Sequence, residues 1–323
     1  MTMNVRNKRV VKKVKLNSGI GLELGPLASP VVKKSEGDIY YLDHLSQADL
    51  RKKYKNEPVD LDKIVPVDYV IVGSLKETVG RKKFDYVIAS HVIEHIPDTI
   101  SWLKEIHEVL NPGGILSLAI PDKRFTFDYD RHLSYSSDVI GAYVDNLTSP
   151  TSAMMYDYII HCADGIDTAV AWGDKDYYKK FPPKRRWNHQ DAVDMCLQNL
   201  NPDIYVDCHC YVYTPTSFAE ILRELTENDL IDFEVASFLE TQSNELEFYV
   251  SLRKVGRDVS KKSRLQKIPK IKDEQDIYRE KNDSLMIRNE QLEREIRSIK
   301  NSISWNIISP LRRAKGVVRR KSK

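Results

Sequence analysis

The sequence of 323 residues predicts an α/β fold, in which helices cover both faces of a doubly wound parallel sheet. Two observations support this. Short apolar runs alternate with amphipathic stretches between residues 16 and 125, and strands that alternate with helices form parallel sheets. In addition, the segment from Gly19 to Asp43 joins two apolar runs through a Gly-Pro turn and ends on a carboxylate.

The segment from Gly19 to Asp43 sets the order of the other elements. It predicts a strand, a tight turn at Gly25-Pro26, a helix, and a second strand over residues 39–42. In a Rossmann-like fold, a carboxylate about twenty residues after the first turn accepts hydrogen bonds from ribose hydroxyls. Asp43 stands at that place, so the segment predicts a cofactor that carries a ribose.

The first turn indicates which ribose cofactor to expect. Dinucleotide binding needs glycines, because backbone N–H groups must approach a pyrophosphate. Here Pro26 and Pro30 remove N–H donors, and Gly25 is the one glycine of the turn. S-adenosylmethionine has no phosphate, and Glu23 precedes the turn, where it can meet the positive end of such a ligand. The turn therefore favours S-adenosylmethionine.

The segments after Asp43 continue the alternation of strand and helix. Proline and glycine together at residues 111–114 predict the end of a helix just before a buried strand. The predicted elements are a third strand region at 64–72, a fourth strand at 84–89, a helix at 100–110, a fifth strand at 115–120 and a later helix at 216–225.

A resemblance to a known family extends as far as Asp128. It includes the run FDYVIASHVIEHIPDTISWLKEIHEVLNPGGILSLAIPDKRFTFD, which begins at Phe84. The sequence resembles class I S-adenosylmethionine-dependent methyltransferases, in particular those found with bacterial surface polysaccharide synthesis. The resemblance implies a seven-stranded Rossmann-like sheet closed by an antiparallel hairpin, here residues 233–239 and 247–252. The first turn departs from the family, because many relatives have more glycines there.

The resemblance also implies an activity. It points to a methyltransferase, EC 2.1.1.-, that O-methylates a sugar during O-antigen or capsule biosynthesis. One alternative is a methyltransferase for a small metabolite or a lipid. Another is a degenerate S-adenosylmethionine-binding scaffold that is oligomerised by a coiled coil.

Cofactor contacts follow from the resemblance position by position. The carboxylate of Asp68 has an alternative role as an ordinary strand-end cap. The implied contacts are Glu23 and Gly25 at the methionine end and first turn, Asp43 at the ribose, Asp68 near the adenine, and Ser90 with His91 after the fourth strand.

The run His91-Val92-Ile93-Glu94-His95 carries two histidines four residues apart. A zinc-protease motif needs Glu beside the first histidine, whereas here Glu94 is beside the second. The pattern therefore favours packing in the cofactor pocket, with His91 as a possible catalytic group, over a metal site.

A general base is predicted at His209. Period-two alternation would place Asp207, His209 and Tyr211 on one strand face, so that Asp207 orients the imidazole. The alternative is a half-buried histidine satisfied by a neighbour. A zinc site formed with Cys196, Cys208 and Cys210 lacks the Cys-x-x-Cys spacing.

Acceptor binding is predicted beside and within a long insertion. Asp122, Lys123 and Arg124 follow the fifth strand, where the two basic residues can pair with a phosphate or a uronate. Residues 126–215 are rich in tyrosine and too long for a bare loop, which predicts an acceptor-binding insertion with helices of its own. Its tyrosines and tryptophans offer flat faces to sugar rings. The alternative is a surface salt-bridge cluster over a tyrosine-rich core.

The ends of the chain differ in composition from its middle. A basic, mobile arm is expected at residues 1–15, before a catalytic domain at 16–255 and a basic linker at 256–272. Residues 273–303 show a heptad seam that predicts a coiled coil, with a solvated single helix as the alternative. Residues 304–323 form a basic amphipathic tail, for which membrane binding is favoured over RNA binding.

These features predict a location and partners. The net charge of +3 gives no case for nucleic acid, and four cysteines form no disulfide framework. Neither a signal peptide nor a membrane span is recognised, so a cytoplasmic protein, peripheral on the inner face of the plasma membrane, is expected. The expected partners are a glycan acceptor, further copies of the chain and a glycosyltransferase whose ending the tail resembles.

Overall fold

The computed structural model describes residues 3–174, 177–182, 184–201, 206–256, 258–272 and 294. The chain divides into two compact units, residues 1–270 and 271–323. The predicted coiled coil and basic tail lie outside the described residues, apart from Arg294. Among the helices of the described part, none is long and apolar enough to cross a membrane.

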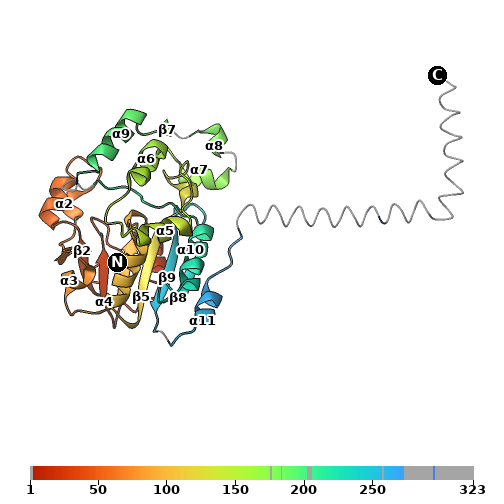
Figure 1. Ribbon diagram of the computed structural model, residues 1–323. Coiled ribbons are helices and arrows are strands. Elements are labelled where there is room, and N and C mark those ends of the chain that lie inside the picture. Colours follow the sequence, from red (N-terminus) through yellow and green to blue (C-terminus); the bar gives the residue numbers. More distant parts are fainter. Residues whose placement is uncertain are drawn as a thin grey trace, which may run out of the picture. The chain divides into compact units, whose positions relative to one another are not determined.

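The core of the first unit is a seven-stranded sheet with the order β3-β2-β1-β4-β5-β9-β8 (Figure 1). The strands β1 to β5 run parallel to one another, and β9 is antiparallel to both β5 and β8. This confirms the predicted α/β sheet with its closing hairpin. The strands are β1 (Ile20–Leu24), β2 (Asp38–Asp43), β3 (Tyr69–Val70), β4 (Phe84–Ser90), β5 (Leu110–Pro121), β8 (Phe233–Leu239) and β9 (Glu247–Lys254).

The third strand is much shorter than the predicted region at 64–72. Pro66 has no N–H to give to a ladder, and the N–H of Val65 donates to the carbonyl of Leu27, outside the sheet. The fifth strand is longer than predicted, because it begins at Leu110, which pairs with Phe84.

The connection from β1 to β2 contains no helix, so the helix predicted there is wrong. Residues 25–37 form a series of turns instead. The buried carboxylate of Glu23 accepts the N–H groups of Val31 at 2.6 Å and Val32 at 3.2 Å, which fixes the loop on the sheet. These bonds, together with Pro26 and Pro30, take the donors that a helix needs.

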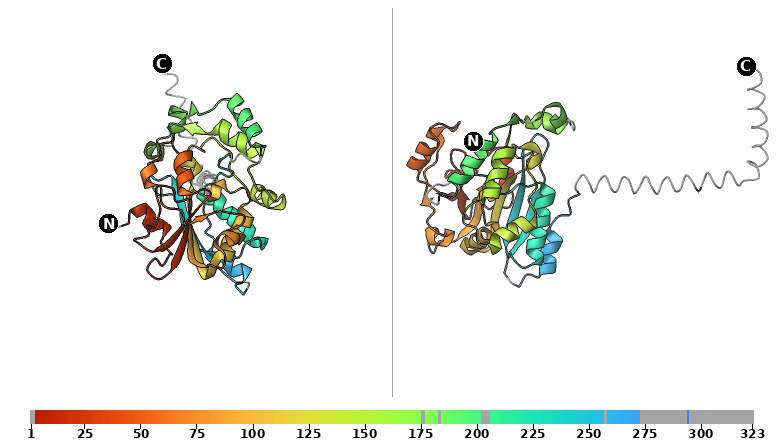
Figure 2. Two further views of the ribbon diagram at one scale, coloured as in Figure 1. Left: turned by 90° about the vertical axis from the view of Figure 1, so that its left-hand side faces the viewer. Right: turned by 45° about the horizontal axis from the view of Figure 1, so that its top comes forward.

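An N-terminal helix packs against strands β5 and β9 of the sheet. α1 (Val5–Val10) lies within the stretch predicted to be a mobile arm, and it lies beside the sheet in Figure 2. Val10 is fully buried in a cluster with Val31 and Val32. The side chain of Asn7 donates to the carbonyl of Val31 at 2.9 Å, and the hydroxyl of Ser117 donates to the carbonyl of Val10. The arm is therefore held by burial and by polar bonds to the sheet.

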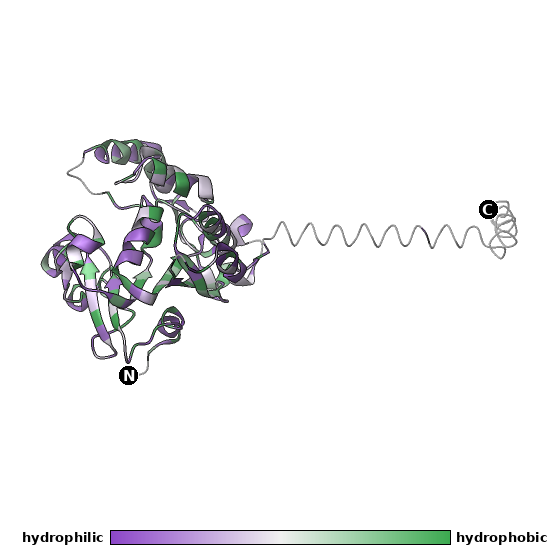
Figure 3. Cartoon of the chain, turned by 60° about the horizontal axis from the view of Figure 1, so that its bottom comes forward, coloured by the Kyte–Doolittle hydropathy of each residue, from purple (hydrophilic) through white to green (hydrophobic). Residues whose placement is uncertain are grey.

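Most of the other helices around the sheet bury apolar side chains. Figure 3 shows the apolar residues concentrated on the strands and on the helix sides that meet them. In α4, for example, Ile100, Leu103 and Ile106 are buried. These helices are α2 (Gln47–Lys53), α3 (Leu75–Val79), α4 (Thr99–Val109), α10 (Pro215–Glu227) and α11 (Lys261–Lys267), with short 3-10 turns at Leu61–Lys63, Ile93–His95 and Lys123–Phe125.

The helix α11 lies in the segment predicted to be a linker. Its Arg264 is buried and donates to the carbonyl of Ile231 at 2.6 Å, and Lys267 pairs with Glu234 at 2.5 Å. The basic residues of this segment therefore anchor it to the start of β8 and to the turn before that strand.

The insertion between β5 and α10 has helices of its own, as predicted. It starts beyond the carboxyl end of β5, and most of its helices lie above the sheet in Figure 1. Tyr205, one of its predicted tyrosines, is outside the described residues. Its elements are α5 (Ser136–Val144), α6 (Ser152–His161), β6 (Ala163–Asp164), α7 (Thr168–Gly173), α8 (Tyr177–Lys180), β7 (Lys184–Arg185) and α9 (His189–Gln198).

Candidate active site

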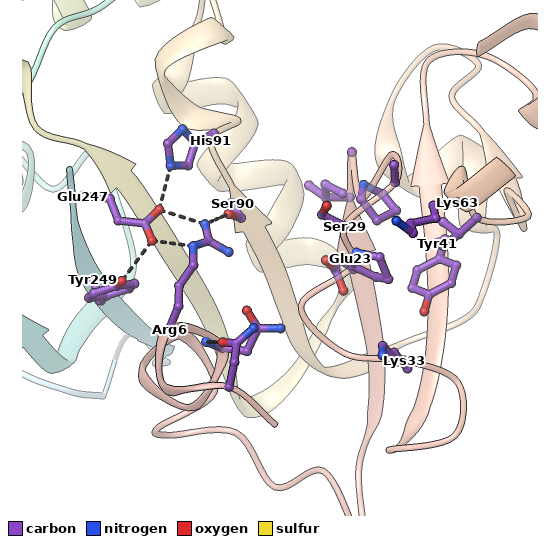
Figure 4. Close-up of a pocket in the computed structure, with 18 of the residues that line it drawn as sticks. Arg6, Glu23, Ser29, Lys33, Tyr41, Lys63, Ser90, His91, Glu247 and Tyr249 are labelled. Atoms are coloured by element: carbon purple, nitrogen blue, oxygen red, sulfur yellow. Dashed lines mark hydrogen bonds and ion pairs between the residues drawn. The ribbon is translucent and has the colours of Figure 1, made fainter. Parts of the chain in front are cut away.

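A cavity of about 1200 Å³ opens at the carboxyl ends of β1 and β4 (Figure 4). This is the edge of a parallel sheet at which α/β proteins bind their ligands. The insertion and the β8–β9 loop reach the same cavity through Thr168 and Leu246. The principal polar residues that line it are Arg6, Glu23, Ser29, Lys33, Lys63, Ser90, His91 and Glu247.

Gly25 provides an open place in the cavity wall. Its φ of +60° suits glycine, and its N–H donates to the carbonyl of Leu42 at 2.9 Å. A Cβ at this position would meet only Val92, at 3.6 Å, so the space above the turn is free of described protein atoms. A ligand can therefore approach the backbone closely here.

Glu23 lines the cavity while its carboxylate holds the loop of residues 25–37. Only 1% of the residue is exposed. Burial raises the pKa of Glu23 to about 7, although the N–H groups of Val31 and Val32 and the charge of Arg6 oppose the rise. The carboxyl group is thus partly protonated at neutral pH. Its oxygens already accept hydrogen bonds from the loop of residues 25–37.

Asp43 and Asp68 stand at strand ends, as the sequence indicated. Asp43 is buried at the tip of β2 and accepts the N–H of His44 at 2.7 Å. Asp68 accepts the N–H of Tyr41 at 2.8 Å and pairs with Lys34 at 2.6 Å, which is the capping role given above as its alternative. Neither carboxylate is among the described residues that line the cavity.

A charged network joins α1 to the sheet inside the cavity (Figure 4). The guanidinium of Arg6 donates to both oxygens of Glu247, at 2.5 and 2.8 Å, and to the hydroxyl of Ser90 at 2.7 Å. Tyr249 donates its hydroxyl to Glu247 at 2.9 Å. Burial acts to raise the pKa of Glu247, but the bonds from His91 and Arg6 lower it to about 2. Glu247 is therefore ionised.

His91 occupies a backbone conformation that is uncommon for a side chain other than glycine. Its φ is +54°, and its N–H donates to the carbonyl of Ala119 at 2.9 Å. Such conformations are concentrated in functional loops. Burial acts to lower the pKa of His91, but the hydrogen bond with Glu247 and the charge of Glu94 raise it above its ordinary value.

Three histidines surround the buried side chain of Glu94, and each has one ring nitrogen held by a carboxylate. This arrangement fixes the ring orientation and the tautomer. The pairs are His91 Nε2 with Glu247 at 2.6 Å, His95 Nδ1 with Asp207 at 2.9 Å, and His209 Nδ1 with Asp128 at 2.6 Å.

The predicted pairing of Asp207 with His209 is wrong. Residues 206–210 form no strand, so the period-two argument does not apply. The N–H groups of Cys210 and Tyr211 both donate to the carbonyl of Glu94, at 2.7 and 3.1 Å, and this bends the segment around the end of β4. Asp207 reaches His95 as a result.

The partner of His209 is itself held by a buried guanidinium. Arg131, whose side chain is 2% exposed, pairs with Asp128 at 2.9 Å and with Asp157 at 2.8 Å. It also donates to the carbonyl of His209 at 2.9 Å. Burial acts to raise the pKa of Asp128, but His209 and Arg131 hold it below its ordinary value. This group joins three segments of the insertion.

A family model described as a methyltransferase domain matches residues 40–225, which is more than half of the chain. The chain belongs to this family. No curated protein matches this sequence.

The solved structures to which the chain is similar include other methyltransferases. The glycopeptide N-methyltransferase MtfA in complex with sinefungin is 13% identical, with a TM-score of 0.39, and the match covers 79% of this chain and 95% of MtfA. CcbJ from Streptomyces caelestis is 11% identical, with a TM-score of 0.37, over 77% of this chain and 94% of CcbJ. The CurJ carbon methyltransferase is 12% identical, with a TM-score of 0.36, over 76% of this chain. The match spans about half of the CurJ chain, 51%.

In this methyltransferase, the residues after β5 differ from their predicted acceptor role. Asp122 is fully buried and accepts bonds from Arg124 and from the hydroxyl of Thr241, each at 2.6 Å. Lys123 turns inward and donates to the carbonyl of Arg131 at 2.5 Å. Arg124 alone of the three keeps an exposed side chain, 45% of it. The structure thus uses Asp122 and Lys123 for internal bonds, because backbone carbonyls and a hydroxyl surround them.

The sequence analysis missed Arg6, Glu247 and Asp128 as site residues of the methyltransferase. Arg6 belongs to a basic stretch that looked mobile, and Glu247 opens the last strand. Asp128 ends the run that carries the family resemblance, so that run held a signal for it. Arg6 bonds to Glu247 and Ser90, which lie 241 and 84 residues away, and His91 is 156 residues from Glu247, so no local pattern reveals these contacts.

Proposed function

We propose that this methyltransferase transfers a methyl group from S-adenosylmethionine to a hydroxyl of a sugar, during the synthesis of a bacterial surface polysaccharide. The observation that carries the proposal is the cavity at the carboxyl ends of β1 and β4, with Gly25 open in its wall and His91 beside it. The family assignment supports the reaction class. The resemblance of residues 84–128 supports the acceptor class.

The residues around the cavity suit S-adenosylmethionine as the donor. The volume of about 1200 Å³ is ample for a ligand of this size. Gly25 would lie under the ligand, and Ser90 would border its methionine end. Asp43 is buried at the tip of β2 outside the lining, so its carboxylate would have to turn toward the cavity to hold the ribose hydroxyls. When bound, the sulfonium supplies an electrophilic methyl group.

The protein must supply alignment and a proton acceptor, because a sugar hydroxyl loses its proton as it is methylated. His91 lines the cavity and is the favoured base. The ionised Glu247 accepts a hydrogen bond from Nε2 of His91, which leaves Nδ1 to take up a proton. His209 is held in the same way by Asp128, but it is 5% exposed and does not line the cavity.

Aromatic side chains of the insertion support a carbohydrate acceptor. Trp172 stacks on Phe125 with ring centroids 4.2 Å apart, and its Nε1 donates to the carbonyl of Glu245 at 2.8 Å. Glu245 and Thr168 line the cavity. The stacked rings are thus next to the cavity wall, and flat aromatic faces suit the apolar faces of sugars. Oligomerisation through residues 273–303, membrane attachment through residues 304–323 and a glycosyltransferase partner complete the proposal.

The test is methyl transfer from S-adenosylmethionine labelled in its methyl group. The purified protein is incubated with nucleotide sugars, lipid-linked saccharides, small hydroxylated metabolites and phospholipids in separate reactions. We expect label in a saccharide. Label in a metabolite or a phospholipid alone would overturn the sugar assignment, and donor binding without transfer to any class would favour the scaffold alternative.

A further inference from the structure

We propose that Glu94, His95 and His209 bind one divalent metal ion of the zinc type, in a cluster next to His91 of the cavity wall. The three residues come from the turn after β4 and from the end of the insertion. Nothing in the spacing of His91 and His95 predicted this site, because its second histidine comes from a distant segment.

The three side chains already converge. Each offers one ligand atom, and these atoms lie within 4.8 Å of one another. A zinc ion bound at 2.0–2.2 Å brings its ligands to within about 4 Å of each other, so a side-chain adjustment of roughly 1 Å completes the site. The rings of His95 and His209 meet edge to face at 4.6 Å, which places both beside Glu94.

The side chain of Glu94 is an independent indication of a bound cation. The residue is fully buried, and within the described part of the chain neither carboxylate oxygen has a hydrogen-bond partner. Nδ1 of His91 is 3.8 Å away, beyond hydrogen-bonding distance. A buried carboxylate without a partner is costly, whereas a metal ion would satisfy both its charge and its lone pairs.

The two histidines are oriented as metal ligands usually are. Nδ1 of His95 is held by Asp207 and Nδ1 of His209 by Asp128, which leaves Nε2 of each ring for an ion. Metal-binding histidines commonly donate their other N–H to a carboxylate in this way. Arg131 in turn fixes Asp128, so this outer layer is itself buried and bonded.

The donor set indicates the kind of metal. Two imidazoles and one carboxylate suit Zn²⁺ or a neighbouring first-row ion better than Mg²⁺ or Ca²⁺, which prefer oxygen ligands. Three protein ligands leave a coordination position open. Binding of the ion does not depend on the proposed function.

The experiment measures metal binding rather than methyl transfer. The full-length protein is stripped with a chelator, dialysed, and titrated in separate samples with Zn²⁺, Mn²⁺ and Mg²⁺. Bound metal is counted by mass spectrometry of the separated protein, and thermal unfolding is followed in parallel. We expect one Zn²⁺ per chain, a raised unfolding temperature with Zn²⁺, and weaker binding of Mg²⁺.

Variants locate the site. Glu94→Gln and His95→Gln are expected to weaken Zn²⁺ binding at least tenfold. His132→Gln is the matched control, because the His132 side chain is 88% exposed, and it should bind Zn²⁺ like the wild type. Failure of the wild type to retain Zn²⁺, or equal binding by Glu94→Gln and the wild type, would overturn the proposal. If a variant does not fold, the wild type alone still tests the proposal. A wild-type unfolding temperature that does not rise with Zn²⁺ would contradict the metal site.

Discussion

The two sides of the proposed active site are built in different ways. The proposed donor side, Glu23, Gly25 and Asp43, comes from one short stretch of chain and depends on backbone turns. The proposed acceptor side, Glu94, His95, Asp128 and His209, lies outside the lining of the cavity and joins distant segments through buried charge pairs. We therefore expect the donor side to tolerate substitutions that preserve its turns. The acceptor side should lose its geometry when one of its buried charges is removed.

The largest expected effect is on catalysis at the boundary between the two sides. His91→Gln removes the favoured proton acceptor and is expected to lower kcat by about 10²- to 10⁴-fold, the usual contribution of a general base. The variant should still bind the donor. Steady-state kinetics with the acceptor found by labelling would measure this. A kcat within twofold of the wild type would exclude His91 as the base.

Loss of the buried guanidinium on the acceptor side is expected to have the largest effect on stability. Arg131→Met leaves Asp128 and Asp157 without their shared partner. Removing one member of a buried ion pair costs about 3–5 kcal/mol of unfolding free energy. Urea unfolding measures it, with Arg81→Met at an exposed position as the control. Equal costs for the two variants would remove the distinction between the sides.

The donor side should show its own signature in the pH dependence of stability. The folded state raises the pKa of Glu23 from 4.5 to about 7, so it binds the proton more tightly than the unfolded state. Stability therefore falls by about 3 kcal/mol as pH rises between these values, and Glu23→Gln should abolish that fall. Urea unfolding at several pH values, with exposed Glu57→Gln as the control, tests this. A wild-type slope in Glu23→Gln would contradict it.

A smaller effect is expected where α1 joins the cavity. Arg6→Met removes the bonds to Glu247 and Ser90, but the Arg6 side chain is 37% exposed, so solvent screening limits the loss to about 1 kcal/mol. The pKa of Glu247, now about 2, should rise. The ionised Glu247 contributes stability above its unfolded-state pKa of 4.5, and this stability is lost as the pH falls through its folded-state pKa. In Arg6→Met the loss should therefore occur at a higher pH than in the wild type. Exposed Lys8→Met should leave the acid limb unchanged.

Much of the fold follows from local pattern, and the exceptions have a common cause. The bounds of β8 were predicted residue for residue, and α4 is shifted by one residue from its prediction, because both have regular apolar periods. The helix α1 was missed, because Val10 is its one buried residue and becomes buried only against the sheet. The prediction of a helix after β1 was wrong, because N–H groups of the loop donate to the carboxylate of Glu23 instead. The helix propensity of the local sequence does not indicate such a contact.

The site divides along the same line. Glu23, Gly25, Ser90 and His91 line the cavity, where the family resemblance implied cofactor contacts, whereas Asp207 was paired with the wrong histidine. A contact between side chains 112 residues apart has no local signature. The strand predicted at residues 207–211 was wrong, because alternation over five residues was not sufficient evidence for a strand.

The most direct test of the central claim is calorimetric titration with S-adenosylmethionine and S-adenosylhomocysteine, with NAD as the control ligand. We expect both sulfur ligands, but not NAD, to bind the wild type. Asp43→Ala should weaken binding by about 1.5–3 kcal/mol, the value of hydrogen bonds to a charged group. Exposed Asp62→Ala should bind like the wild type. Absence of binding by the wild type would contradict the account of the cavity as a methyl-donor site.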